Sequence, residues 1–162
     1  MTEPETPEGF TPTKEIYAYP DYSELEGRIV ASISANTECI NLYFEDGTSL
    51  GLVVSGDCCS HSYWHDLIGV NHLLEGARIV KCQEMLLGER EIGPYCECTK
   101  AYALKIVSEH PVWGEVTTIF AFRNDSNGYY GGECTVGPIL DGTWPVTGDV
   151  LNVAELEIGE RK

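Results

Sequence analysis

The sequence predicts a mainly β protein of the α+β kind. We expect an antiparallel sheet, or a small β-roll or half-barrel, of about six to eight strands with one short helix near 62–75. Two observations favour this class: short apolar runs alternate with polar residues, and the 162 residues include 17 glycines and 9 tyrosines. With 43% hydrophobic residues, a chain of this length forms one domain with a substantial core.

The first three expected strands lie near 28–35, 38–45 and 48–54 and form an antiparallel meander. Apolar residues occupy every second position of the first two, as in strands that bury one face. Asp46-Gly47 stands before the third strand, and this pair favours the primed turn of a hairpin because both residues tolerate a positive φ.

The short helix is expected next, because Trp64, Leu67 and Leu74 follow roughly one helical face and Gly76 suits a C-cap. Strand-like alternation then returns in three segments, at 77–85, 98–107 and 116–123. A last strand is expected after Tyr129. Glycines and prolines predict loops at 88–94, 111–114 and 137–148.

The chain divides into three parts. Residues 1–20 are acidic and rich in proline, so we expect a flexible arm when they are alone. Residues 21–148 form the globular β-rich domain. Residues 149–162 form a tail, either a last strand or a short helix.

The charge of the chain is strongly acidic, with 26 acidic against 10 basic residues and a formal net charge of −16. Nucleic-acid binding draws its affinity from lysine and arginine on phosphates, so we expect no direct contact with nucleic acid. An acidic surface instead steers a protein toward basic partners.

Targeting signals are not expected, since the first residues have neither a basic nor an apolar segment and no run is long enough to cross a membrane. The 7 cysteines are odd in number and irregularly spaced, which does not suit a disulfide framework. We therefore expect reduced cysteines and a location in the host cytoplasm or in a virion.

The segment GDCCSHSYWH at 56–65 admits three interpretations. The first is a structural zinc site, because zinc prefers thiolate and imidazole ligands. Three short ligand pairs are near: His61 with His65, Cys96 with Cys98, and Cys58 with Cys59. The two histidines would share a face in a helix. The usual spacing of two ligand pairs is missing, however, so we expect no metal.

The second interpretation is a nucleophilic Cys58 or Cys59, activated by a helix N-terminus with His61 as the base. The third makes Asp57 the organiser of a turn, with the thiols packed at a corner and two aromatic side chains on the sheet. We favour the third, because nucleotide-binding and common hydrolase motifs are missing and small thiols are usually buried. No catalytic residue and no cofactor are expected.

Two longer segments, GDCCSHSYWHDLIGV at 56–70 and FAFRNDSNGYYGGEC at 120–134, resemble an uncharacterised domain family of bacterial and phage proteins. The resemblance covers about residues 28–136. It implies a small protein that is frequent in phage genomes and has no assigned activity.

We expect the two motifs to meet in space, because the glycines of SNGYYGG allow close backbone approach beside two tyrosines. Packing is the simpler reason for such a meeting, and a small pocket is the alternative. The binding residues expected at this junction are Asp57, Cys58, Cys59, Tyr63, Trp64, Asn127, Tyr129 and Tyr130.

These observations favour a non-enzymatic, phage-type acidic interaction protein. It would be a virion-associated structural or assembly component, or a host-directed binding protein. The expected partner is a basic protein or a neighbouring virion subunit, and self-association into a homo-oligomer is a further option. The alternatives are an anti-defence inhibitor of a basic nucleic-acid-binding host protein, a small zinc-binding module, and a cysteine-dependent enzyme.

Overall fold

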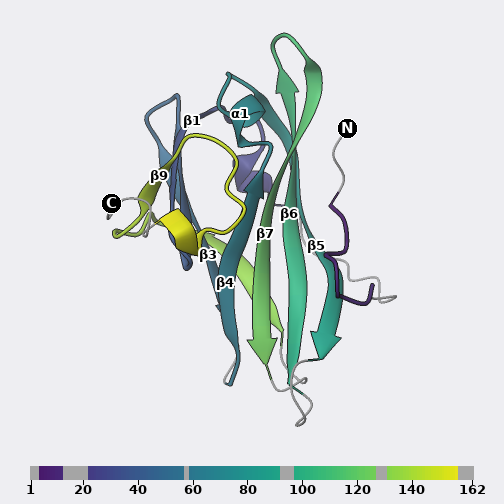
Figure 1. Ribbon diagram of the computed structural model, residues 1–162. Coiled ribbons are helices and arrows are strands. Elements are labelled where there is room, and N and C mark those ends of the chain that lie inside the picture. Colours follow the sequence, from purple (N-terminus) through teal and green to yellow (C-terminus); the bar gives the residue numbers. More distant parts are fainter. Residues whose placement is uncertain (1–3, 13–21, 57–58, 92–96, 127–130, 157–162) are drawn as a thin grey trace.

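The computed structural model describes residues 4–12, 22–56, 59–91, 97–126 and 131–156. In these residues the chain forms two antiparallel sheets, one of five strands and one of four, which lie as two layers (Figure 1). Neither sheet closes into a barrel. The structure confirms the predicted mainly β, antiparallel fold class.

The five-stranded sheet has the order β8-β3-β2-β1-β9. Its strands are β1 (Val30–Ala35), β2 (Cys39–Phe44), β3 (Ser49–Gly56), β8 (Gly132–Gly137) and β9 (Trp144–Val146). The meander expected from β1 to β3 is confirmed. Its second turn holds Gly47 at φ 87°, and the Asp46 carboxylate accepts the N–H of Thr48 at 2.9 Å.

The four-stranded sheet has the order β4-β7-β6-β5. Its strands are β4 (His61–Ile68), β5 (Arg78–Glu91), β6 (Cys98–His110) and β7 (Gly114–Ser126). The chain therefore builds three strands of the first sheet, then the whole second sheet, and then returns to both edges of the first.

The helix is much shorter than the one expected near 62–75. The helix α1 covers only Val70–Leu73, and residues His61–Ile68 form strand β4 instead. Besides α1, the described residues contain the 3-10 turn η1 (Ser23–Leu25), and residues 154–156 are also helical. A shift in the β4–β7 register between Trp64 and Leu67 explains the difference. This irregularity turns the side chains of Trp64 and Leu67 to the inner face of the sheet. Two buried residues three positions apart are typical of a helix, so the bulged strand imitates a helical pattern in the sequence. No helix in the described ranges is long and apolar enough to cross a membrane.

The core lies between the two sheets and takes residues from both. Its largest members include Trp64, Phe120 and Phe122, all without exposed surface. The Trp64 ring meets the edges or faces of both phenylalanines, with centroids 6.3 and 5.4 Å away. Tyr102 stacks on Phe122 at 4.8 Å. All four rings belong to the four-stranded sheet, and together they form an aromatic cluster of the core.

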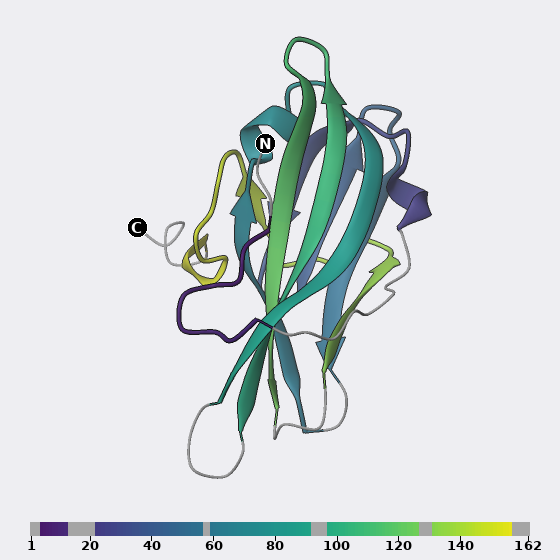
Figure 2. The ribbon, with the colours of Figure 1, turned by 90° about the vertical axis from the view of Figure 1, so that its right-hand side faces the viewer.

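The segment 4–12 lies against the four-stranded sheet beside β5 (Figure 2). Thr11 and Glu89 exchange backbone hydrogen bonds of 2.8 and 3.0 Å. On the opposite edge, Leu67 and Val150 exchange a similar pair. Segments from both ends of the described chain thus pair with the two edge strands of this sheet. The domain boundaries expected from the sequence stay predictions.

Candidate interaction surface

The described part of GDCCSHSYWH connects β3 to β4. Asp57 and Cys58 lie outside the described residues. Cys59 is exposed and has a φ of 70°, a left-handed conformation that residues other than glycine rarely adopt. A strand, β4, follows these residues, so the helix that would have activated a cysteine does not follow them.

Tyr63 and Trp64 point to opposite faces of β4, as neighbouring strand residues must. Trp64 is fully buried, and its indole N–H donates to the Leu52 carbonyl at 3.2 Å. Tyr63 lies half-buried on the outer face, where burial and the nearby Asp125 carboxylate raise its pKa. The two aromatic side chains therefore do not line one pocket.

The described ends of the two motifs lie side by side, because Gly56 of β3 pairs with Gly132 of β8. Within the four-stranded sheet, the Asn124 amide donates to the Ser62 hydroxyl at 2.9 Å, and Ser62 in turn donates to the Ser55 carbonyl of the other sheet at 2.9 Å. A Cβ atom on Gly132 would collide with the Ser62 hydroxyl. This junction is thus closely packed, with the glycine leaving room for Ser62 and Asn124.

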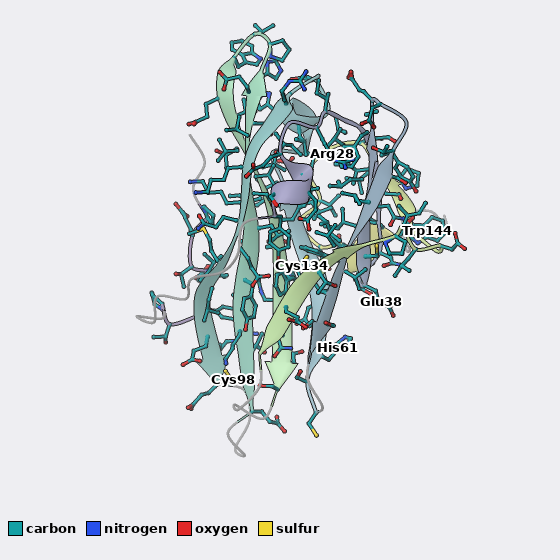
Figure 3. All side chains as sticks on the ribbon, turned by 180° about the vertical axis from the view of Figure 1, so that it is seen from behind. Arg28, Glu38, His61, Cys98, Cys134 and Trp144 are labelled. Carbon is teal, nitrogen blue, oxygen red and sulfur yellow. The ribbon has the colours of Figure 1, made fainter. Side chains whose placement is uncertain are left out.

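The rest of the expected junction, Asn127, Tyr129 and Tyr130, lies outside the described residues. Their meeting with Cys59 therefore stays a prediction. Figure 3 shows His61 and Cys98 near this end of the molecule, with Cys134 near its middle.

The strand geometry removes the basis for pairing His61 with His65 on one zinc ion. Residues four apart in a strand share a face but lie about 13 Å apart at 3.3 Å per residue. A single tetrahedral ion cannot join them, because zinc–nitrogen distances are only about 2.0–2.1 Å.

Within the described ranges, one group of side chains has the spacing of a metal site: His72, Glu75 and His110. The Glu75 carboxylate lies 2.9 Å from Nε2 of His110 and 3.2 Å from Nδ1 of His72. However, Nδ1 of His110 accepts the backbone N–H groups of Val112 and Trp113 at 3.0 and 3.1 Å. Neutral histidine carries one ring hydrogen, so Nε2 holds it and donates to Glu75 instead of binding a metal.

Three buried thiols, those of Cys39, Cys98 and Cys134, are unsuited to nucleophilic attack. Burial raises the pKa of each, and for Cys134 the rise is large. A reactive cysteine needs a lowered pKa, because the thiolate is the nucleophile. The Cys39 thiol donates to Oδ1 of Asn41 at 3.0 Å, and Cys134 belongs to the hydrophobic core.

A buried polar cluster joins the two sheets. The Tyr22 hydroxyl donates to Oε1 of Glu84 at 2.9 Å, and the same carboxylate oxygen accepts the Cys134 N–H at 3.2 Å. Glu84 is 5% exposed, and burial raises its pKa. Burial also raises the pKa of Tyr22 far above its ordinary value. The cluster was not predicted from the sequence, although Glu84 stands at an inward position of an alternating strand.

The most exposed large apolar side chains that the structure describes include those at the tip of the β6–β7 hairpin, where Val112 is 75% and Trp113 is 69% exposed. The hairpin projects beyond the other strands (Figure 1). The turn is fixed by the two hydrogen bonds that the buried His110 ring accepts. An exposed tryptophan is therefore presented on an ordered turn.

Carboxylates surround this tip. Glu109 and Glu115 are exposed and lie directly opposite each other where β6 and β7 meet the turn. Like charges in such cross-strand positions repel. On the other side of Glu109 stands Arg78, whose guanidinium donates to the Gly27 carbonyl. A loop was predicted at 111–114, without a functional role. The signal for this tip is the apolar pair Val112-Trp113 in a short turn between two glutamates, Glu109 and Glu115.

Together these features define a two-sheet β protein with a packed motif junction and a projecting apolar hairpin tip framed by carboxylates. The chain belongs to a family described as a domain of unknown function (DUF7448), whose model matches residues 23–136. The match confirms the resemblance to an uncharacterised family, and it spans the chain from η1 into β8. No curated protein and no solved structure matches the chain.

Proposed function

We propose that the protein is a non-enzymatic, acidic interaction protein that binds a basic protein partner through the tip of the β6–β7 hairpin. The observation that carries the proposal is the exposure of Val112 and Trp113 on a turn that His110 holds in place. The partner is a neighbouring virion subunit or a host-directed target in a bacterium, as the resemblance to bacterial and phage proteins suggests.

Tryptophan is a frequent binding hot spot, because it brings a large apolar area at a small cost in conformational entropy. Trp113 is well prepared for this role, since its backbone N–H is already bonded to His110. Binding then needs little ordering of the turn, and less of the contact energy is lost.

Charge favours a basic partner. The exposed Glu109 and Glu115 face each other beside the tip, and the whole chain has a net charge of −16. A lysine or arginine placed between the two carboxylates would relieve their repulsion and steer association. The partner surface is therefore expected to combine an apolar pocket with a basic rim.

The test is capture from a bacterial lysate on the immobilised full-length protein, quantified by mass spectrometry, with Trp113→Ala compared against the wild type. We expect Trp113→Ala to lose the specific partner at least about tenfold, as at a hot spot. The captured set should be rich in basic proteins and should fall as the salt concentration rises.

The matched control is Leu151→Ala, which removes an equally exposed apolar side chain from the C-terminal segment. It should retain the partner. Equal capture by the wild type and Trp113→Ala, or equal loss in both variants, would contradict the proposal. A third variant, Glu115→Lys, tests the charge argument and should weaken capture without changing the apolar tip.

A further inference from the structure

We infer that the outer face of the four-stranded sheet holds a binding site for a small amphipathic anion, one with an apolar body and a carboxylate. The site lies under the segment 4–12 and is distinct from the hairpin tip. It is built from a cavity, a buried guanidinium and an apolar floor.

The cavity exists because the segment 4–12 covers the sheet without filling the space beneath it. A space of about 460 Å³ lies between this segment and the sheet, and a neighbouring one of about 330 Å³ shares Pro7, Glu8, Asp66 and Arg123 with it. Spaces of this size fall within the range of small-molecule sites. The segment is held by the Thr6 hydroxyl, which donates to the Leu87 carbonyl at 2.8 Å, and by the Thr11–Glu89 pair.

The two parts of the cavity differ in chemistry. The larger part is floored by Ile68, Ile119 and Ala121, with Leu87 at its side. The smaller part is lined by polar side chains, including Tyr63, Arg90 and Thr99. A ligand that spans both would therefore place its apolar body in the first and its polar head in the second.

Arg123 borders both parts and is 7% exposed. A guanidinium has five N–H donors, yet the one hydrogen bond of this side chain in the described residues goes to the Phe122 carbonyl at 3.4 Å. In those residues no carboxylate lies within ion-pair distance of Arg123 or Arg90. Both guanidinium groups instead lie near the Phe10 ring, with carbons 5.4 and 4.6 Å from its centroid.

Several carboxylates face this region. Asp66 lies 2.7 Å from Nδ1 of His65 without hydrogen-bond geometry, and its charge favours the charged form of Arg123. Asp125 accepts the Thr99 hydroxyl at 2.6 Å, and Glu5 and Glu8 are exposed on the covering segment. In the described residues none of these carboxylates forms a hydrogen bond with Arg123, so its donors are left for the anionic group of a ligand, and a carboxylate matches their fork geometry.

The experiment titrates octanoate into the full-length protein, followed by calorimetry and by methyl NMR. Octanoate should bind and shift the methyl signals of Ile68, Leu87 and Ile119. Arg123→Met should weaken binding at least about tenfold, because it removes the charge-assisted hydrogen bonds while keeping the length of the side chain. Lys81→Met, which removes an exposed positive charge on β5, should bind like the wild type.

Ala121→Leu provides a second variant, because it fills the apolar floor without touching charge and should also weaken binding about tenfold or more. Octanol should bind the wild type at least about tenfold more weakly than octanoate does. Unchanged methyl signals, equal affinity in Arg123→Met and the wild type, or equal binding of octanol would each overturn the inference. None of these results depends on the hairpin tip, so this site and the proposed function can fail separately.

Discussion

Trp64 and Trp113 show how differently one residue type is used at two places in this molecule. Trp64 is fully buried between the sheets, with its N–H bonded to Leu52 and its ring packed on two phenylalanines. Trp113 is 69% exposed at the end of a projecting hairpin. The first stabilises the fold, whereas the second has its contact area available for another molecule. Only their surroundings separate the two roles.

The largest expected effect contrasts these two residues directly. Trp64→Ala should lower the free energy of unfolding by about 3–5 kcal/mol, the usual loss for a large core residue. Trp113→Ala should change it by no more than about 0.5 kcal/mol, as for an exposed residue. Urea unfolding of both variants measures the difference. Similar losses of unfolding free energy in the two variants would contradict the distinction between a core tryptophan and an exposed one.

A pair of glycines in β8 sharpens the same contrast between packed and open positions. Gly132→Ala should destabilise the protein by about 1–3 kcal/mol, because the new Cβ would collide with Ser62 and press on Asn124. Gly137 belongs to the same strand and has no atom within 4 Å of such a Cβ. Gly137→Ala is therefore the control and should be close to neutral in urea unfolding. If Gly132→Ala and Gly137→Ala lose equal stability, the loss in Gly132→Ala does not come from close packing at the motif junction.

The buried cluster of Tyr22, Glu84 and Cys134 gives the core a pH dependence. Burial raises the pKa of Glu84, so the folded state binds this proton more tightly than the unfolded state does. The resulting stabilisation is complete below the unfolded pKa and is lost as the pH rises through the folded pKa. The stability of the wild type relative to Glu84→Gln should therefore fall with rising pH. Urea unfolding at several pH values measures this, and parallel curves for the two proteins would contradict it.

The smallest effect concerns the order of the hairpin tip. His110→Ala removes the acceptor of the Val112 and Trp113 N–H groups. Amide hydrogen exchange at these two positions should become about fivefold faster or more, since each lost hydrogen bond is worth about 1 kcal/mol. His72→Ala removes an exposed ring from the same cluster and should leave both amides protected. Unchanged exchange in His110→Ala would mean that the tip is ordered by something else.

The strands were the most predictable part of the fold, because alternation reports directly which face is buried. The meander of β1 to β3 follows from that alternation and from Asp46-Gly47 alone. A short helix near 62–75 is confirmed at Val70–Leu73, but its expected first part is a strand, since a bulge between Trp64 and Leu67 imitates helical spacing. A register irregularity depends on the partner strand, which a single sequence does not reveal.

The candidate sites were less predictable than the fold. Trp64 was assigned to a junction because it follows the cysteines, but its side chain belongs to the core. Trp113 and Arg123 were passed over, because their importance depends on exposure and on what covers the sheet. Both are properties of long-range packing, so residue spacing carries little information about them.

The order of the strands also bears on how the chain reaches its folded state. The outer strands of the five-stranded sheet come late: Thr135 bonds to Val53 across 82 positions and Thr143 bonds to Ser34 across 109. The first three strands must wait, with both edges open, until the whole four-stranded sheet has been synthesised. Folding dominated by such distant pairings is slow, on the order of milliseconds to seconds. An unfinished chain therefore exposes unpaired β1 and β3 edges, which are templates for aggregation during synthesis.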